Sequence, residues 1–237
     1  YPRPLSRSEV RFEPAKSGLR EGLGEAAEGI WPGEVLEHRM IRADQEQFEI
    51  VKGKNYWIFG DFLFTDEEQY KKHEKELSPI RGSVIVSSLR RSPLTGFLDF
   101  AYSTATPQAI QLILAYPETV KGHIVLDAGS GDGILSILAS RLGAEKVIAV
   151  EKDPSQAALS RRMLALNQVR NVTVLESDFE TLKGSPVVDG VDVVLANLPD
   201  SGLYQKDSRY DTWHLDLSSW IKPAWYFLLG AEINESG

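Results

Sequence analysis

The chain of 237 residues contains no cysteine, which excludes disulfide bonds, thiolate catalysis and cysteine metal sites. It also has few histidines, and these four are scattered without metal-ligand spacing, so no metal site is expected: His38, His73, His123 and His214. Long apolar runs are missing as well. The longest, Ala224–Leu229, is far shorter than the roughly twenty residues that cross a bilayer. We therefore expect no membrane span, and the lack of cysteine is compatible with a cytoplasmic protein.

Basic residues are in the minority, because 26 Lys and Arg stand against 34 Asp and Glu, a net charge of −8. Nucleic-acid binding relies on Lys and Arg contacts to phosphate, so this balance disfavours RNA as a partner but leaves room for a local basic patch. A hydrophobic content of 42% in a chain of this length allows one large domain or two small ones. The oligomeric state stays open.

The most informative stretch of the chain is Val125–Gly133, an apolar strand that ends in Asp127 and runs into a glycine-rich turn. A second apolar strand, which ends in Glu151, follows about twenty residues later. This order predicts the first half of a doubly wound α/β sheet. Gly129 and Gly131 allow the backbone to approach a ligand closely. Glu151 can accept hydrogen bonds from a ribose diol, so we expect a cofactor that contains adenosine.

The glycine spacing separates two classes of cofactor. A dinucleotide fingerprint has its third glycine at the sixth position of the turn, where this chain has Ile134. Asp127 would also repel a pyrophosphate, whereas it would attract the ammonium group of a sulfonium cofactor. The pattern Val-Leu-Asp-Ala-Gly-Ser-Gly-Asp-Gly resembles the first motif of the class I S-adenosylmethionine-dependent methyltransferases. A glycine triplet alone would be weak evidence, since it also occurs in ordinary strand-to-helix turns.

Further motifs follow in the order of that family, over roughly Tyr102 to Leu229. The resemblance implies a Rossmann-like fold with S-adenosylmethionine as cofactor. It places Glu151 on the ribose hydroxyls, Asp178 near the exocyclic amine of the adenine, and Phe179 against the ring. The full set of implied cofactor-binding residues is Thr104, Asp127, Gly129, Gly131, Glu151, Asp178, Phe179 and Asn197.

The segment Tyr102–Gln108 narrows the resemblance. It is similar to the Phe-Gly-Thr-Gly-Thr-His segment of the methyltransferases that modify lysine and amino-terminal amines of a ribosomal protein. That similarity implies that Thr104 and Thr106 lie near the methionine end of the cofactor. The two glycines and the histidine of the family are replaced here by Ser, Ala and Pro. The alternative is that these threonines cap the next helix, which suits Thr106 before Pro107.

A candidate acceptor site follows the fourth apolar strand, Val191–Ala196. The sequence Asn197-Leu198-Pro199-Asp200 resembles the Asn-Pro-Pro-Tyr or Asn-Leu-Pro-Tyr motif of amine methyltransferases. Asn197 is then expected to bind the acceptor nitrogen, and Asp200, in place of the aromatic residue, could attract a cationic amine. These two are the candidate catalytic residues. The alternative is that Asn197 and Pro199 simply end the strand and turn the chain.

Protein-arginine methyltransferases share the first motif but are disfavoured. They need two acids in the loop after this strand to hold a guanidinium group. That loop here contains aspartates but no glutamate.

Residues 1–92 read as a small α+β or mainly-β domain, and residues 93–237 as the methyltransferase domain. Strand-like residues run from Val35 to Ile58 with a turn at Lys52–Asn55. A capping box at Thr65–Glu68 predicts a helix to about Leu77, and Val84–Val86 predicts another strand. This domain is a candidate for substrate recognition, and a structural or dimerising role is as well supported.

The expected fifth strand lies within Ile221–Leu229, and only Gly230–Gly237 follow it. The final helix and two strands of the complete fold are therefore expected to be missing or replaced by the amino-terminal domain.

Taken together, the residues and the resemblance predict an enzyme, a methyltransferase that acts on an amine nitrogen of a protein. The alternatives are methylation of RNA or of a small molecule, and a non-catalytic binding subunit that keeps the fold.

Overall fold

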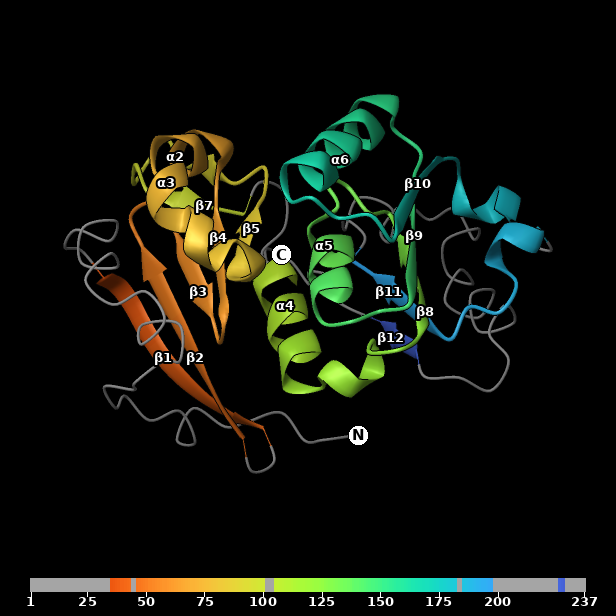
Figure 1. Cartoon of the computed structure of the whole chain (residues 1–237), viewed down its shortest axis with the longest axis horizontal. Helices are drawn as coiled ribbons and strands as arrows, with labels where there is room; N and C mark the ends of the chain where they lie inside the picture. Colours follow the sequence, from red (N-terminus) through yellow and green to blue (C-terminus); the bar gives the residue numbers. More distant parts are fainter. Residues whose placement is uncertain (1–34, 44–45, 101–104, 183–184, 198–225, 229–237) are drawn as a thin grey trace, which may run out of the picture. The chain divides into compact units, whose positions relative to one another are not determined.

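The computed structural model describes residues 35–43, 46–100, 105–182, 185–197 and 226–228 (Figure 1). The chain divides into two compact units, Tyr1–Ala101 and Tyr102–Gly237. In the described part, no helix is both long and apolar enough to cross a membrane.

Unit 1 contains a five-stranded sheet in the order β1-β2-β3-β4-β5. Neighbouring strands are antiparallel except β4 and β5, which run parallel. The strands are β1 (Val35–Ala43), β2 (Glu46–Gly53), β3 (Trp57–Phe59), β4 (Phe62–Thr65) and β5 (Val84–Val86). The predicted turn between β2 and β3 is confirmed, because the Gly53 amide donates to the Tyr56 carbonyl at 2.9 Å.

Aromatic side chains form much of the unit 1 core. Phe59 and Phe64 are fully buried and meet edge to face at 5.4 Å between ring centroids. Trp57 stacks on Phe59, and Phe100 packs against all three rings. These rings explain why the strand-rich segment folds, since each buries a large apolar area.

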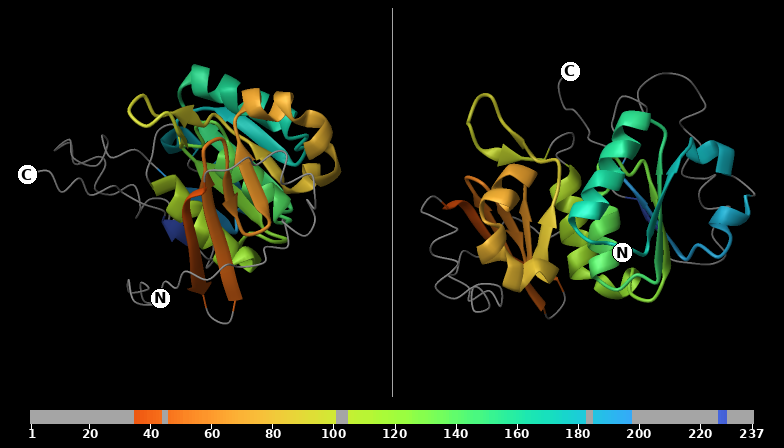
Figure 2. Two further views of the ribbon diagram at one scale, coloured as in Figure 1. Left: turned by 90° about the vertical axis from the view of Figure 1, so that its left-hand side faces the viewer. Right: turned by 45° about the horizontal axis from the view of Figure 1, so that its top comes forward.

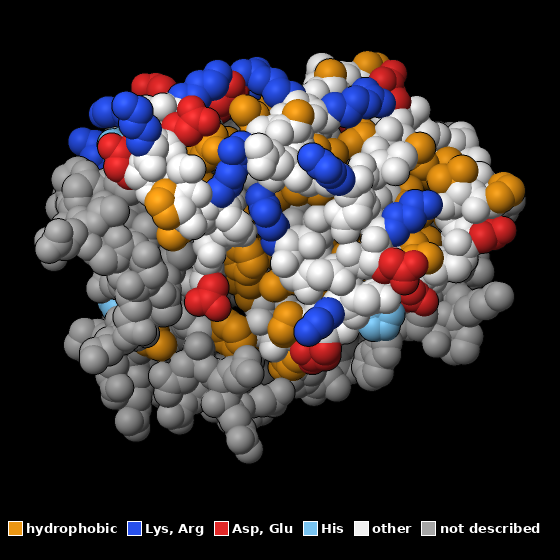
Figure 3. Space-filling model, in the orientation of Figure 1, with side chains coloured by type: hydrophobic (Ala, Val, Ile, Leu, Met, Phe, Trp, Pro, Cys, Tyr) orange, Lys and Arg blue, Asp and Glu red, His pale blue; other side chains and the backbone are white. Residues whose placement is uncertain are grey.

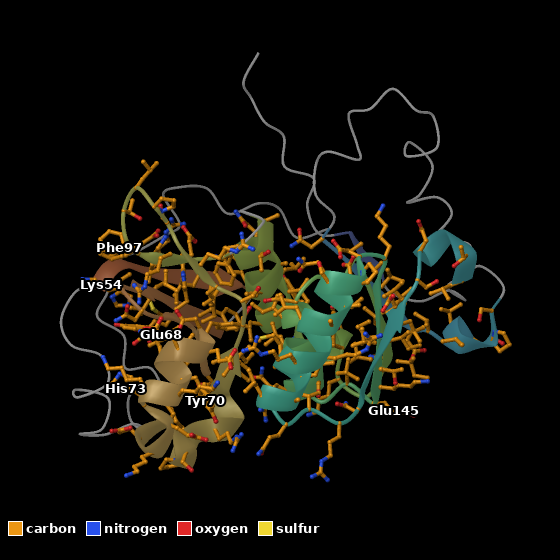
Figure 4. All side chains as sticks on the ribbon, turned by 90° about the horizontal axis from the view of Figure 1, so that it is seen from above. Lys54, Glu68, Tyr70, His73, Phe97 and Glu145 are labelled. Carbon is orange, nitrogen blue, oxygen red and sulfur yellow. The ribbon has the colours of Figure 1, made fainter. Side chains whose placement is uncertain are left out.

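The predicted helix after Thr65 differs in two ways. Asp66, not Thr65, caps it, because the Asp66 carboxylate accepts from the Gln69 amide at 2.7 Å while Thr65 ends β4. The helix also breaks at His73 into α2 (Glu67–Lys72) and α3 (Glu74–Leu77) before the 3₁₀ turn η2 (Ser78–Ser83). In Figure 4, Glu68, Tyr70 and His73 mark this segment. Tyr70 of α2 and Leu77 of α3 are both buried.

A small hairpin of β6 (Arg90–Arg91) and β7 (Leu98–Asp99) extends from unit 1 (Figure 2). It is fixed to the β2–β3 turn, because the Leu98 amide donates to the Lys54 carbonyl at 3.1 Å. The Trp57 indole also donates to the Leu98 carbonyl at 3.2 Å. Figure 4 shows Lys54 and Phe97 at this same end of the unit. These bonds keep the residues after 92 with unit 1, so the structural division falls later than the predicted boundary.

Unit 2 contains a five-stranded parallel sheet in the order β10-β9-β8-β11-β12. The chain starts in the middle at β8, moves outward to β10, and then crosses to the other side, so a switch point lies beside β8 (Figure 1). The strands are β8 (Ile124–Ala128), β9 (Lys146–Glu151), β10 (Val172–Glu176), β11 (Val193–Ala196) and β12 (Tyr226–Leu228). The predicted α/β, Rossmann-like fold is confirmed.

Three helices cover one face of this sheet: α4 (Ala105–Ala115), α5 (Ile134–Arg141) and α6 (Pro154–Leu166) (Figure 1). The 3₁₀ turn η3 (Pro117–Thr119) follows α4. The other face carries an apolar cluster that includes Leu126, Ile148 and Val194, closed by Leu182 and Val188. Those two residues belong to the 3₁₀ turns η4 (Phe179–Leu182) and η5 (Pro186–Val188). Because strand side chains alternate, Asp127 points to the face opposite Leu126, which is the helix face.

Candidate functional site

The glycine-rich turn joins β8 to α5 at the carboxyl end of the sheet. Its first residues are tied to the next strand, because the Gly129 and Ser130 amides both donate to the Val150 carbonyl, at 2.9 and 3.0 Å. Gly129 and Gly131 have φ values of +71° and +55°, a region that favours glycine. A Cβ added to Gly131 would meet no atom within 4 Å, so the turn is open at this point.

Gly133 has a packing role of its own. It precedes α5 with φ at +82°, and a Cβ placed on it would lie 2.6 Å from the Ser160 Oγ of α6. The absence of a side chain therefore lets α6 approach the start of α5. Sequence reasoning noted this glycine only through its spacing.

Asp127 is almost fully buried, with 1% of its surface exposed, and its carboxylate faces α5. The Ser136 hydroxyl donates to its Oδ2 at 2.6 Å, and the Ser136 backbone also donates to it. The pKa of Asp127 is raised from 3.8 to about 6. Burial is the main cause, the neighbouring carboxylates of Asp132 and Glu151 add to it, and the Ser136 bonds act in the opposite direction. Asp127 thus fixes the first turn of α5 and concentrates negative charge beneath the glycine turn.

Glu151 ends β9 beside the same turn. Its Oε2 accepts from the Gly131 amide and its Oε1 from the Asp153 amide, each at 2.9 Å. Asp153 in turn caps α6 by accepting from the Ser155 amide at 2.7 Å, with Pro154 as first helical residue.

Asn197 follows β11 at the carboxyl end of the sheet, where open α/β sheets bind ligands. Its side-chain amide donates to the Thr106 Oγ1 at 3.0 Å. Thr106 lies inside α4, which begins at Ala105, so the alternative that Thr106 caps this helix is wrong. Its hydroxyl instead joins α4 to the end of β11, although the two residues are 91 positions apart in the chain.

The remaining candidates are described in part. Asp178 follows β10 at the carboxyl end of the sheet, and its carbonyl accepts from the Thr181 hydroxyl at 2.7 Å. Phe179 begins η4, and only its backbone is described. Thr104 and Asp200 lie outside the described residues. The structure therefore brings Asp127, the glycines, Glu151, Asp178 and Asn197 to one edge of the sheet.

These residues fit a ligand that is polar and positively charged. The turn is open at Gly131, and the Ser130 Oγ is buried without a hydrogen-bond partner in the described part of the protein. Three carboxylates, Asp127, Asp132 and Glu151, interact around the turn. A cation is favoured where like charges crowd together. Among the described residues, no cluster of His, Cys, Asp or Glu could hold a metal ion.

Sequence reasoning missed two partners in the site. Ser136, which holds Asp127, was visible only as a hydroxyl residue within the apolar run Ile134–Ala139. The pairing of Thr106 with Asn197 had no signal in the spacing, since it depends on α4 and β11 meeting in space.

Comparison with known proteins supports the motif assignment. Residues 100–200 match the family model described as ribosomal protein L11 methyltransferase (PrmA). Over these residues the chain resembles the ribosomal protein L11 methyltransferases. The resemblance inferred from the motifs is thereby confirmed, and the matched segment includes every candidate residue.

Two curated relatives and one solved structure illustrate the similarity. The ribosomal protein L11 methyltransferase of Caldanaerobacter subterraneus subsp. tengcongensis is 32% identical over 129 residues, covering 52% of this chain and 37% of the relative. That of Bacillus subtilis is 38% identical over 104 residues, covering 41% and 31%. The crystal structure of ribosomal protein L11 methylase from Lactobacillus delbrueckii subsp. bulgaricus has a TM-score of 0.36 and 24% identity, covering 50% of this chain and 53% of that chain. The match thus spans about a third of the curated relatives' length.

Proposed function

We propose that this protein is an S-adenosylmethionine-dependent methyltransferase that methylates an amine nitrogen of a protein. The observation that carries the proposal is the glycine turn at the switch point of the sheet, with Asp127 beneath it and Glu151 bonded to Gly131. The match of residues 100–200 to the L11 methyltransferase model supports it independently. As in the sequence-based prediction, we assign the cytoplasm as the location.

Each candidate residue is assigned to one part of the cofactor according to its position in the sheet. Glu151 has an oxygen on each side of its carboxylate that can accept a ribose hydroxyl in addition to its amide bonds. Asp178 and Phe179 follow β10 and would face the adenine. Asp127, Thr104 and the open backbone at Gly131 would hold the methionine end.

When bound, S-adenosylmethionine supplies a methyl group on a positively charged sulfur. The acceptor nitrogen forms a bond to that carbon as the carbon–sulfur bond breaks, and the nitrogen loses a proton. Asn197 would orient the neutral amine from its place after β11, where the bond from its amide nitrogen to the Thr106 hydroxyl fixes the side chain. Such alignment, with the reacting atoms about 3 Å apart, accounts for much of the rate in reactions of this kind. Asp200 would attract the amine in its cationic form before it loses a proton.

A protein acceptor is favoured over RNA by two observations. The relatives are named for methylating ribosomal protein L11. Figure 3 shows Lys and Arg side chains interspersed with Asp and Glu on the face that it draws, and the whole chain carries a net charge of −8. Neither this mixture of charges nor the negative net charge favours binding to the phosphate backbone of RNA.

The proposal is tested in two stages with the full chain. Calorimetric titration with S-adenosylhomocysteine should give saturable binding that Asp178→Asn weakens. Transfer of radiolabelled methyl groups to a cell extract, separated into protein and RNA fractions, should label protein, and Asn197→Ala should lower labelling more than it lowers cofactor affinity. Cofactor binding without any methyl transfer would favour the alternative of a non-catalytic binding subunit. Label in the RNA fraction would show that the acceptor is RNA rather than protein. An absence of binding would overturn the proposal.

A further inference from the structure

Glu151 makes two backbone contacts that a role in ribose binding does not require. Its Oε2 accepts from the amide of Gly131 in the glycine turn, and its Oε1 accepts from the amide of Asp153 at the start of α6, each at 2.9 Å. These amides belong to the connections that follow two adjacent strands, β8 and β9. One carboxylate therefore links two segments of the site.

The bond to Gly131 supports an unusual backbone conformation. Gly131 has φ at +55°, and no atom lies within 4 Å of the position of a Cβ, so side-chain packing at that position cannot hold the turn. A hydrogen bond to an ionised carboxylate is stronger than one between neutral groups. Glu151 is thus a specific restraint on this open part of the turn.

The same two bonds restrain the carboxylate itself. Each oxygen of a carboxylate can accept about two hydrogen bonds, so each still has capacity for one hydroxyl. Because both oxygens are already oriented, a vicinal diol would meet a fixed pair of acceptors. Binding groups that are ordered in advance lose less conformational freedom when the ligand arrives.

We propose that Glu151, beyond the ribose contact already assigned to it, is a positioning residue that holds the glycine turn before any ligand arrives. In the ligand-free protein it holds Gly131 and the start of α6 in place, and in doing so it presents both oxygens to the two hydroxyls of a ribose. The part concerning ribose rests on the proposed function, whereas the part concerning the turn does not.

Glu176 offers a matched control. It ends the neighbouring strand β10 and pairs with Glu151 in the register of the sheet. Its carboxylate, however, forms an ion pair with the Arg161 side chain at 3.6 Å, whereas the carboxylate of Glu151 accepts from backbone amides. Glu176→Gln therefore makes the same replacement of a carboxylate by an amide at the end of the neighbouring strand, without removing a bond to the turn.

The test measures backbone amide hydrogen exchange in the full chain without ligand, read residue by residue by NMR. In Glu151→Gln one carboxylate oxygen becomes an NH₂ group, which cannot accept from a backbone amide. The exchange rate of the Gly131 or the Asp153 amide should rise about tenfold. In Glu176→Gln both rates should stay as in wild type. Glu151→Asp replaces the Gln variant if that does not fold, because the shorter side chain keeps the charge but cannot reach both amides.

A second readout tests whether the positioned carboxylate meets the two hydroxyls of a ribose. The ratio of affinities for S-adenosylhomocysteine and its 2′-deoxyribose analogue should fall about tenfold in Glu151→Gln and stay constant in Glu176→Gln. Unchanged exchange would overturn the positioning role, even if affinity fell and the proposed function stood. Faster exchange in a protein whose wild type binds no S-adenosylhomocysteine would support the restraint on the turn and reject the proposed function. An unchanged affinity ratio would overturn the selection of a diol.

Discussion

The sheet of unit 1 and the sheet of unit 2 place their buried polar side chains differently. In unit 1, Glu49, Thr65 and Gln69 are buried on three different elements, and Glu49 lies 2.9 Å from the His38 imidazole. In unit 2, half of the buried polar side chains described, namely Asp127, Ser130 and Ser136, gather around one turn at the carboxyl end of the sheet. Neighbouring strands of unit 1 mostly run in opposite directions, so no single edge collects equivalent ends. Parallel strands place all their carboxyl ends together, which creates one polar edge on an apolar core.

The largest expected effect concerns the aromatic core of unit 1. Phe59→Ala should lower the free energy of unfolding by about 3–5 kcal/mol, because it leaves a cavity among fully buried rings. Urea denaturation of the full chain measures this loss. Affinity for S-adenosylhomocysteine, measured at low temperature on the folded fraction, should hardly change, since no candidate cofactor residue lies in unit 1. Loss of ligand binding by the folded variant would break the contrast between the units.

Gly133→Ala should come next, at about 2–4 kcal/mol of unfolding free energy. Its φ of +82° disfavours a side chain, and the new methyl group would overlap the Ser160 Oγ. Ser160→Ala in the same chain removes that oxygen and should recover part of the loss, leaving the backbone cost. Denaturation midpoints of the two single variants and the double variant separate the two terms, and a fully stable Gly133→Ala would show that α6 can move away.

Asp127→Asn should stabilise the protein at pH 8 by about 1–3 kcal/mol. A carboxyl whose pKa is raised on folding contributes stability below its unfolded pKa of 3.8, and that contribution is lost as the pH rises to about 6. Above pH 6 the wild type therefore carries a buried charge that the amide lacks. The difference should shrink toward pH 4, which thermal unfolding at several pH values would reveal.

The same variant should bind S-adenosylhomocysteine more weakly, because the charge beneath the turn is gone. If wild type and Asp127→Asn bound S-adenosylhomocysteine equally well, the role of Asp127 would be limited to holding α5 through Ser136.

The smallest effect is expected at the contact between α4 and Asn197. Thr106→Val keeps the shape but removes the hydroxyl, so methyl transfer to protein should fall about tenfold, which corresponds to about 1.4 kcal/mol. Affinity for S-adenosylhomocysteine should change less. Thr106→Ser keeps the hydroxyl and should retain most of the rate. If the Ser variant were as slow as the Val variant, the methyl group rather than the hydrogen bond would matter.

Much of unit 2 was predictable because its signals are local. The strand that ends in Asp127, the glycine turn, Glu151 and the Asp153-Pro154 helix start are each encoded within a few neighbouring residues. In unit 1 the turn after Gly53 was equally local, whereas the helix break at His73 and the cap at Asp66 were not recovered. Thr65 satisfied the capping pattern but was taken by β4, where its hydroxyl donates to the Asn55 carbonyl at 3.3 Å.

The sequence by itself determined the α/β class, the first strand of the sheet and the residue types at the carboxyl ends of the strands. Hydrophobic period and glycine spacing reveal these because they are properties of short segments. The tertiary structure decided which of those residues touch: Asp127 with Ser136, Glu151 with Gly131, and Asn197 with Thr106. Each contact joins separate segments of the chain, and its geometry follows from how strands and helices pack rather than from the spacing of letters.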